Sequence, residues 1–331
     1  MPSRRATIKS LAKINLDLRV LHKRTDGFHE LRTVFQTISL ADTIDIEYER
    51  ARRTDISIDD PLAIPGNLVL KAAQAVLDEL KIHARVHFRL RKKIPMGGGL
   101  GGGSSNAAAV LLALPVLAGH SYKSPLDAER IAAELGSDVP FFLTGGAAVG
   151  IGRGTEVYEL ADLKPEPLLV ISPGLHVATG PAYQALRRGL TANDSSSRIN
   201  GFRAFVRVLA SEHSAGAASP FSANDFEAVV FRQFPQLQTI ARKLSQLGMS
   251  GARPGVRMTG SGSAIFAIFG SRAERDGAEA VLKGNRVFGR YLVMPAALVN
   301  RGSYQRLWRR QLRQHIRTDQ SLWPLHSRYE K

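Results

Sequence analysis

The chain has 331 residues, of which 44% are hydrophobic, and it carries 45 lysine and arginine residues against 29 aspartate and glutamate residues, a formal net charge of +16. This composition excludes a disordered, collagen-like or low-complexity chain, and the length predicts about two domains. Because the chain has no cysteine, a disulfide framework, a thiolate zinc site, an iron–sulfur cluster and a cysteine nucleophile are also excluded.

The positive charge is unevenly spread. Residues 301–331 contain eight lysine and arginine residues and two carboxylates, so this segment supplies +6 of the total. A basic surface suits nucleic acid, an anionic membrane or a phosphorylated small molecule, or it keeps a protein soluble. Residues 1–12 lack the apolar run of a secretory signal, and no stretch approaches about 18–20 uninterrupted apolar residues, so we expect a cytoplasmic protein without a membrane span.

The amino-terminal half carries strand signals and then helix signals. In residues 6–21 apolar and polar side chains alternate over much of the length, which predicts a half-buried strand. Further strands are predicted at residues 33–40, 43–48 and 84–91. Helices are predicted at residues 67–80, from about 104 to 118 and at 125–135, with Asn67 as the N-cap of the first.

The carboxyl-terminal half continues this mixture. A strand is predicted at 168–172, a helix broken at Pro235 at 224–247, and two strands joined by a tight turn at 257–269. Residues 191–219, rich in serine, alanine and glycine, predict a flexible surface segment. The pattern is typical of an α+β protein with mixed sheets, and we expect three parts, at residues 1–160, 161–300 and 301–331.

The most distinctive segment is a glycine-rich run before the second predicted helix. It consists of Pro95, Met96, Gly97, Gly98, Gly99, Leu100, Gly101, Gly102, Gly103, Ser104 and Ser105. Such a run lets the backbone adopt positive φ and approach a ligand closely. Because the helix is predicted to begin at or just after Ser104, its free N–H groups point into the loop and favour an anion, most naturally a phosphate. The two serines add hydroxyls for a phosphate oxygen or Mg²⁺.

Two common phosphate-binding patterns fit this run poorly. A P-loop requires a lysine after the last glycine, and none follows here. Residues 97–102 satisfy the G-x-G-x-x-G pattern of dinucleotide-binding folds, but the strand before them is amphipathic and the acidic residue expected about 20 positions downstream is missing. A nicotinamide-dependent enzyme is therefore disfavoured, and a flexible loop without a ligand is the remaining alternative.

Five further segments accompany the glycine run, namely residues 12–16 (AKINL), 23–31 (KRTDGFHEL), 136–142 (GSDVPFF), 224–227 (NDFE) and 259–263 (TGSGS). Together with the run they resemble the galactokinase, homoserine kinase, mevalonate kinase and phosphomevalonate kinase superfamily, the GHMP kinases. Within this superfamily they are similar to the family of 4-diphosphocytidyl-2-C-methyl-D-erythritol kinases. They occur in the order of the family, and the resemblance extends over roughly residues 6–300.

The resemblance implies a two-domain α+β GHMP-kinase fold. Residues 1–160 would form an N-terminal ribosomal-protein-S5-like domain with the ATP-binding glycine loop, and residues 161–300 a C-terminal α/β-sandwich domain. The implied activity is ATP-dependent phosphorylation of the 2-hydroxyl of 4-diphosphocytidyl-2-C-methyl-D-erythritol, on the methylerythritol phosphate route to isoprenoid precursors. Mg²⁺ is expected to accompany ATP.

The resemblance also implies the catalytic pair. Asp138 matches the base or proton acceptor for the reacting hydroxyl, and Lys13 matches the lysine that orients it and neutralises charge on the transferred phosphoryl group. Considered without the family, Asp138 equally suits a helix N-cap, and Lys13 suits the exposed face of a strand.

Further positions match the binding residues of the family. Phe28 and Tyr183 match residues that sandwich the cytosine ring, and His29 matches one that reads the base edge. Asn15 is expected near the reacting alcohol, with Thr179 in the same pocket. By themselves the two aromatic residues suit ordinary packing.

Three positions call for comment. Asn67 matches a position near the adenine, although capping of a helix explains this residue equally well. Phe28 stands where the family usually has tyrosine, and Asp17 stands where an apolar or aromatic residue is expected. Neither departure touches the catalytic pair, so both bear on substrate affinity rather than on the type of reaction.

A basic chain also suits a nucleic-acid-binding or ribosome-binding protein, and the superfamily shares a domain fold with certain ribosomal and translation proteins. Such a protein has no need of Lys13 and Asp138 together with a phosphate loop, and the sequence has no aromatic–basic RNA motif. We therefore expect a small-molecule substrate and no obligatory nucleic-acid partner.

The extension at 301–331 lies beyond the family pattern. It predicts a helix at about 304–317, capped by Ser303, with apolar side chains near helical spacing and arginines around them. Two interpretations stay open. The helix either docks on RNA, an anionic membrane or an acidic partner, or it is a solvated or domain-packed extension.

Overall fold

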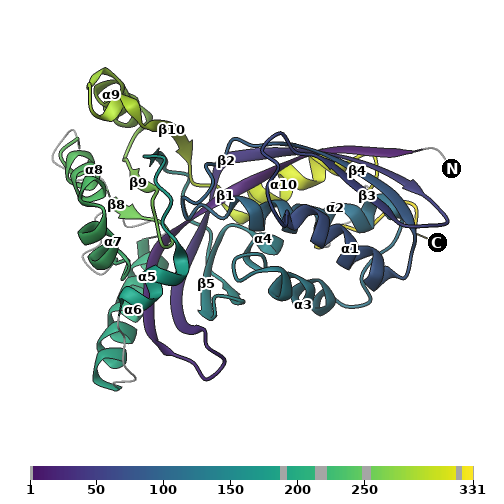
Figure 1. Cartoon of the computed structure of the whole chain (residues 1–331), viewed down its shortest axis with the longest axis horizontal. Coiled ribbons are helices and arrows are strands. Elements are labelled where there is room, and N and C mark those ends of the chain that lie inside the picture. Colours follow the sequence, from purple (N-terminus) through teal and green to yellow (C-terminus); the bar gives the residue numbers. More distant parts are fainter. Residues whose placement is uncertain (1–2, 187–191, 213–221, 248–254, 318–322, 331) are drawn as a thin grey trace.

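Two β-sheets covered by helices organise the molecule (Figure 1). The computed structural model describes residues 3–186, 192–212, 222–247, 255–317 and 323–330. Across these residues no helix is long and apolar enough to cross a lipid bilayer.

The first sheet is formed by the amino-terminal half. Its strands are β1 (Arg4–Lys23), β2 (His29–Arg50), β3 (Asp55–Asp59), β4 (Ala84–Arg91), β5 (Ala147–Gly152) and β6 (Glu156–Glu159). They follow the order β3-β4-β2-β5-β6, with β1 also paired to β2, and only β3 and β4 run parallel. The helices of this half are α1 (Leu68–Leu80), α2 (Gly102–Ala118), α3 (Pro125–Leu135) and α4 (Phe141–Thr144).

The alternation in β4 explains how this sheet separates core from solvent. Its inward-facing side chains are all buried, namely Ala84, Val86, Phe88 and Leu90. On the outer face its arginines pair with carboxylates of the neighbouring strands, at 3.1 Å for Arg85 and Glu49 and at 3.4 Å for Arg89 and Asp59. Part of the positive charge is therefore neutralised by cross-strand pairs on a solvated face.

The second sheet has four antiparallel strands in the order β10-β7-β9-β8. These are β7 (Pro167–Ser172), β8 (Gly255–Met258), β9 (Ile265–Ile268) and β10 (Leu292–Ala297). The helices of this half are α5 (Thr179–Ala185), α6 (Ala192–Glu212), α7 (Glu227–Gln233), α8 (Pro235–Ser245), α9 (Arg272–Gly284) and the 3₁₀ helix η1 (Phe288–Arg290). The expected boundary at residue 160 lies between β6 and β7.

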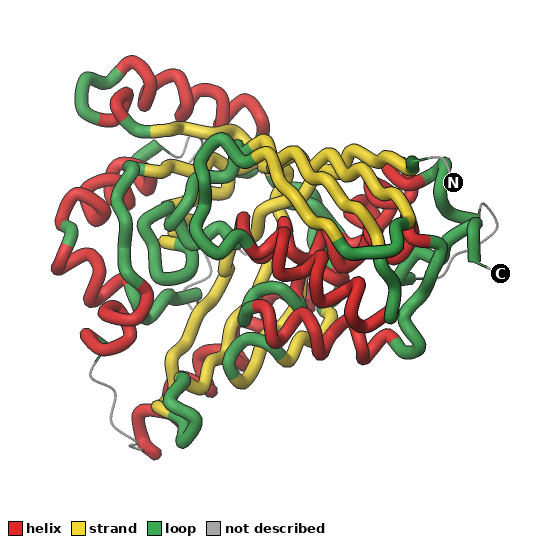
Figure 2. The backbone as a smooth tube through the Cα atoms, turned by 45° about the vertical axis from the view of Figure 1, so that its right-hand side comes forward, coloured by secondary structure: helices red, strands yellow, loops and turns green. Residues whose placement is uncertain are grey.

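The β1–β2 hairpin links the two halves. Figure 2 shows these strands extending away from the first sheet toward the helices of the second half. Leu18 and Val20 of β1 and Leu31 of β2 are buried in the same apolar cluster as Phe226 and Ile265. The two halves therefore share core residues where the hairpin leaves the first sheet, and the cavity described below opens beside this junction.

Most predicted elements are confirmed, and several boundaries differ. The predicted strands at 33–40 and 43–48 form the single strand β2, because residues 41–44 continue the pairing with β1 and the pairing with β4 begins at Thr43. Helix α2 begins at Gly102 rather than at Ser104, since Gly101 has φ +69° and already forms its N-cap. The centre of β1 is buried on both faces, not on one, because the helices and the second half cover both sides.

The prediction of a flexible surface segment at 191–219 is wrong for residues 192–212, which form helix α6. Phe202, Phe205 and Leu209 are buried at helical spacing. Helix α6 packs on β1, so tertiary burial of one face outweighs a serine-rich composition that disfavours a helix. Residues 191 and 213–219 of that segment lie outside the described residues.

The extension forms helix α10 (Arg301–Leu312), which begins and ends earlier than the predicted 304–317 and packs against the first half. Its N-cap is Asn300, whose side chain accepts a hydrogen bond from Ser303 N, so the predicted cap at Ser303 is wrong. The inner face is buried in the core of the first half through Tyr304, Trp308 and Leu312. The domain-packed interpretation of the extension is therefore confirmed for this face. On the outer side several arginines stay exposed, namely Arg306, Arg310, Arg313 and Arg317.

Candidate active site

A cavity of about 700 Å³ lies between the two halves of the molecule. The glycine loop, β1, the β1–β2 hairpin and the segment before α4 line one side, and residues 176–184 and 260–262 line the other. Most of the residues that the sequence singles out are therefore brought together. Those that line the cavity are Lys13, Asn15, Phe28, His29, Gly97, Gly99, Ser104, Asp138, Thr179 and Tyr183.

Lys13 and Asp138 form an ion pair in this cavity. Lys13 Nζ lies 3.2 Å from Asp138 Oδ2, and the lysine side chain is 2% exposed whereas the aspartate is 32% exposed. The alternative that Lys13 occupies an exposed face is thus wrong. Asp138 does not cap a helix either, because α4 starts at Phe141 and its N-cap Pro140 makes no side-chain capping bond. The partly exposed carboxylate can accept a proton from a ligand, and the buried ammonium beside it can balance negative charge on that ligand.

Asn15 fixes the position of the lysine. Its Oδ1 accepts hydrogen bonds from Lys13 Nζ (2.7 Å) and from Gly260 N (2.9 Å), and its Nδ2 donates to Thr33 Oγ1 (2.8 Å). Asn15 is 3% exposed. The Asn15 side chain therefore orients Lys13, and its bond to Gly260 N connects β1 to the second half.

The glycine loop is held by close backbone approach. Gly99 has φ +75°, and a β-carbon there would lie 2.1 Å from Thr259 O. Gly101 has φ +69°, and a β-carbon there would lie 2.9 Å from the Phe142 ring and 3.0 Å from Lys13 Cγ. Glycine is thus required at these two positions, because a side chain would collide with Thr259 or with Phe142 and Lys13.

The two serines that follow the glycines differ in their surroundings. Ser104 lines the cavity. Ser105 is 2% exposed, and its hydroxyl donates to Leu11 O (2.6 Å) and bonds with Ser10 Oγ (2.8 Å). Ser105 is therefore used to attach α2 to β1, whereas Ser104 is the serine that lines the cavity.

The segment 259–263 forms a second glycine loop opposite the first. Thr259 Oγ1 donates to Gly99 O (3.1 Å), and Ala264 N donates to Gly98 O (3.2 Å). Thr179 Oγ1 lies 3.1 Å from Ser261 Oγ at the cavity wall. The sequence analysis assigns no role to Ser261, which is marked only by its place in the segment 259–263.

The aromatic residues of the cavity contact each other and a nearby arginine. The Tyr183 ring stacks on His29, with centroids 4.6 Å apart and planes 17° apart. Phe28 is 49% exposed, and the Arg153 guanidinium lies 4.6 Å from its ring centroid. Burial, aided by Lys23, holds the pKa of His29 below its usual range, which favours the neutral imidazole at pH 7.

Sequence reasoning also missed Arg153 and His176. Arg153 follows β5 and no motif points to it. His176 also lines the cavity, and a β-carbon at Gly97 would lie 2.8 Å from His176 Nδ1. Both add cationic or hydrogen-bonding capacity that suits a phosphate-bearing ligand.

Asn67 lies apart from the residues that line this cavity. Its side chain accepts from Val69 N (3.0 Å), which caps α1, and donates to Asp60 Oδ2 (3.0 Å). Capping accounts for this residue, and the contact with adenine stays a prediction.

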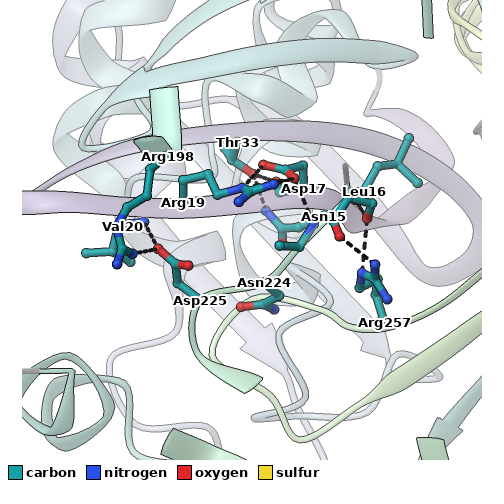
Figure 3. Close-up of polar contacts among 12 residues, drawn as sticks. Asn15, Leu16, Asp17, Arg19, Val20, Thr33, Arg198, Asn224, Asp225 and Arg257 are labelled. Carbon is teal, nitrogen blue, oxygen red and sulfur yellow. Dashed lines mark hydrogen bonds and ion pairs between the residues drawn. The ribbon is translucent and has the colours of Figure 1, made fainter. Parts of the chain in front are cut away.

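Asp17 belongs to a buried polar network between β1 and the segment before α7 (Figure 3). Its carboxylate pairs with Arg19 at 3.0 Å and accepts from Ala223 N at 2.9 Å. Nearby, Asp225 pairs with Arg198 at 2.6 Å. Burial raises the pKa of Asp17 to about 6, and the opposing effect of Arg19 is smaller. The unexpected aspartate therefore joins the two halves of the molecule at a polar contact.

This pKa predicts a pH-dependent stability. Between about pH 4 and pH 6 the folded chain holds a proton on Asp17 that the unfolded chain releases, so the contribution of this group to stability falls as pH rises through that range. Asp17→Asn removes the titration. The free energy of unfolding of the variant, relative to the wild type, should increase by up to about 3 kcal/mol from pH 4 to pH 6.5.

Urea unfolding at each pH measures this difference. Asp55→Asn is the matched control, because Asp55 is 68% exposed beside Arg85, and it should show no such trend. An Asp17→Asn difference that stays constant with pH contradicts the expectation.

Comparison with known proteins identifies the family. Residues 67–146 match the GHMP kinases N terminal domain, and residues 207–286 match the GHMP kinases C terminal domain. The chain is 47% identical to the 4-diphosphocytidyl-2-C-methyl-D-erythritol kinase of Solibacter usitatus over 331 residues, which cover 99% of this chain and 98% of that protein. It is 38% identical to the Thermus thermophilus kinase of the same name over 285 residues, which cover 84% and 92% of the two chains.

Comparison with solved structures supports the same family. A crystal structure of 4-(cytidine 5'-diphospho)-2C-methyl-D-erythritol kinase has a TM-score of 0.68 at 34% identity and covers 89% of this chain and 100% of that chain. Homoserine kinase from Cytophaga hutchinsonii has a TM-score of 0.66 at 18% identity, covering 89% and 95%, which shows a shared fold. With the glycine loop and the lysine–aspartate pair in one cavity, the chain belongs to the 4-diphosphocytidyl-2-C-methyl-D-erythritol kinase family of GHMP kinases.

Proposed function

We propose that the protein transfers the γ-phosphoryl group of ATP to the 2-hydroxyl of 4-diphosphocytidyl-2-C-methyl-D-erythritol, giving the 2-phosphate and ADP, in the biosynthesis of isoprenoid precursors. The observation that carries this proposal is the ion pair of Lys13 and Asp138, 3.2 Å apart, in the same cavity as Gly97, Gly99 and Ser104 of the glycine loop. A phosphate site and a proton acceptor that meet in one cavity suit phosphoryl transfer to an alcohol.

In the proposed reaction Asp138 accepts the proton of the attacking hydroxyl. The hydroxyl oxygen forms a bond to the γ-phosphorus, and the bond from that phosphorus to the bridging oxygen breaks, leaving its electron pair on ADP. Lys13, held by Asn15 at 2.7 Å, balances the charge on the phosphoryl oxygens. These two residues supply positioning and charge stabilisation, which is the main catalytic task in phosphoryl transfer.

ATP phosphates are proposed to lie in the glycine loop. Helix α2 begins at Gly102 directly after the loop, so its first N–H groups and its positive dipole end are directed at the anion. The loop residues and Asn67 keep their proposed ATP-binding roles, with the Ser105 hydroxyl serving the internal contact to Leu11.

Mg²⁺ is proposed to arrive with ATP. Within the described ranges, no group of three or more His, Cys, Asp or Glu side chains is arranged to hold a metal ion. Ser104 and Asp138 both line the cavity and carry oxygen ligands. They fit an ion that keeps several waters and is held mainly by phosphate oxygens. When bound, the ion neutralises charge on the β- and γ-phosphates.

The cytidine end of the substrate is proposed to lie near Phe28, His29 and Tyr183, with Thr179 and Asn15 closer to the alcohol. The support is that Phe28, His29 and Tyr183 all line the same cavity, since aromatic rings can stack on a base. The neutral imidazole of His29 can both donate and accept a hydrogen bond at the base edge.

Phe28→Ala tests the stacking role. Base–aromatic stacking contributes about 1–3 kcal/mol, so the KM for the cytidylated alcohol should rise by about tenfold or more while kcat changes little. Because Phe28 is 49% exposed, its truncation leaves the core intact. Phe28→Tyr keeps the ring and should keep the KM within about twofold. Steady-state kinetics of both variants decide the matter, and an alanine variant with the wild-type KM contradicts the stacking role.

A panel of alcohols tests the function itself. ADP release is followed with 4-diphosphocytidyl-2-C-methyl-D-erythritol, mevalonate and homoserine at equal concentrations. We expect ADP only with the cytidylated alcohol. Release of ADP only with mevalonate or homoserine would place the protein in another branch of the superfamily.

A further inference from the structure

Helix α4 is a single turn that follows the segment carrying Asp138, and its carboxyl end is completed by the C-terminal extension. The last carbonyl groups of a helix lack partners within the helix. Phe142 O accepts a hydrogen bond from Tyr304 Oη at 2.6 Å, and Leu143 O accepts one from Trp323 Nε1 at 2.8 Å. Two residues from the extension therefore satisfy two carbonyls of this turn.

Two glycines directly after α4 leave space for side chains of the extension. Gly145 has φ +67°, and a β-carbon there would lie 2.5 Å from the Tyr304 ring. Gly146 has φ +73°, and a β-carbon there would lie 2.7 Å from Arg301 Cβ. The tyrosine ring thus lies directly against the backbone that leaves α4, and it is fully buried there.

Helix α4 also contacts the catalytic pair from the other side. The space beside Gly101 is closed by both the Phe142 ring and the Lys13 side chain. Phe141 packs on Phe35 with centroids 4.9 Å apart, and Lys13 Nζ lies 5.5 Å from the Phe35 ring centroid. A displacement of α4 would therefore move the surroundings of Lys13 and the segment that carries Asp138 together.

Other contacts of the extension lie away from α4. Ser327 Oγ donates to Val116 O at 2.7 Å, near the end of α2. His315 Nδ1 lies 3.1 Å from Tyr329 Oη, and His315 Nε2 lies 2.9 Å from Arg5 O. The Ser327 and His315–Arg5 bonds attach the extension to the first half, and the His315–Tyr329 bond lies within the extension. None of them touches the segment of Asp138, so they offer matched controls.

We propose that Tyr304 and Trp323 are positioning residues for phosphoryl transfer: they hold α4 so that Asp138 stays aligned with Lys13 and the reacting hydroxyl. The inference rests on the proposed function and adds to it a role for the extension. The match to the Solibacter usitatus kinase spans 99% of this chain, whereas the match to the Thermus thermophilus kinase spans 84%. The extension thus serves, in this chain, as part of the support of the active site.

Tyr304→Phe and Trp323→Phe test this role, since each removes one hydrogen bond and keeps an aromatic ring. Misalignment of reacting groups by about 1 Å can lower rates by about 10²-fold. We expect kcat to fall about tenfold in each variant while the KM values for ATP and the cytidylated alcohol stay within about twofold. Melting temperatures are recorded for every variant, and the kinetics are measured at a temperature at which all are folded.

Tyr329→Phe and Ser327→Ala are the controls, because each removes a hydrogen bond of the extension outside α4. They should keep the wild-type kcat even where they lower the melting temperature. The proposal is overturned if Tyr304→Phe and Trp323→Phe keep the wild-type kcat, if the loss appears in KM, or if the controls lose as much kcat as the test variants.

Failure of the proposed function is a separate outcome. If the wild type releases ADP with another alcohol instead, that function is wrong, and the four variants are compared on that alcohol with the same criteria. A wild type that phosphorylates none of the alcohols overturns both proposals.

Discussion

Asp138→Asn is expected to lower kcat by about 10²–10⁴-fold, the usual contribution of a positioned general base. The asparagine has nearly the same shape as the aspartate. It cannot accept the proton of the hydroxyl, and because it is neutral it cannot form the ion pair that Asp138 makes with Lys13 at 3.2 Å. The KM for ATP should change little, because the glycine loop is untouched.

A coupled assay for ADP measures this loss, and direct binding of ATP shows that the nucleotide site survives. Asp276→Asn is the control, because Asp276 is 58% exposed and pairs with Arg275 on helix α9, so full activity is expected. If Asp138→Asn keeps more than about a tenth of the wild-type kcat, Asp138 does not serve as the base.

Gly99→Ala is expected to have the second-largest effect. A β-carbon at Gly99 would lie 2.1 Å from Thr259 O and 2.9 Å from Thr259 C, and backbone cannot yield as a flexible side chain can. The alanine would also have to adopt φ +75°, which costs about 1–2 kcal/mol. The glycine loop and the second loop must therefore separate, and we expect the KM for ATP to rise at least about tenfold and the melting temperature to fall.

Gly103→Ala is the comparison variant, because it adds the same methyl group to another glycine of the glycine-rich run. Gly103 lies inside helix α2, and the nearest atom to a β-carbon there is 3.9 Å away, in Leu68. Alanine is favourable inside a helix, so this variant should be as stable as the wild type or more so. Thermal unfolding and ATP titration of the two variants are compared directly, and equal effects would contradict the collision at Thr259.

Local patterns allowed much of the site to be predicted. The glycine run, the alternation in β4 and the cap at Asn67 are patterns of neighbouring residues. Each pattern determines the backbone conformation or the burial of residues within a few positions of it. The pairing of Lys13 with Asp138 came instead from the family resemblance, since no local pattern relates residues so far apart in the chain.

The features that were missed depend on distant contacts. Helix α6 forms because one face is buried against β1, and its serine-rich sequence does not signal this. The Ser105 hydroxyl donates to Leu11 O, and the Tyr183 ring stacks on His29. The packing of the extension on α4 likewise joins residues more than 150 positions apart, which no sequence period can reveal.

The most direct test of the central claim is the site of phosphorylation in the product. The wild type is incubated with ATP, Mg²⁺ and 4-diphosphocytidyl-2-C-methyl-D-erythritol, and the products are followed by phosphorus NMR. The proposed mechanism predicts one new phosphomonoester, on the tertiary 2-hydroxyl, formed in equal amount with ADP. A phosphate on another hydroxyl, or inorganic phosphate formed in place of the ester, would contradict it.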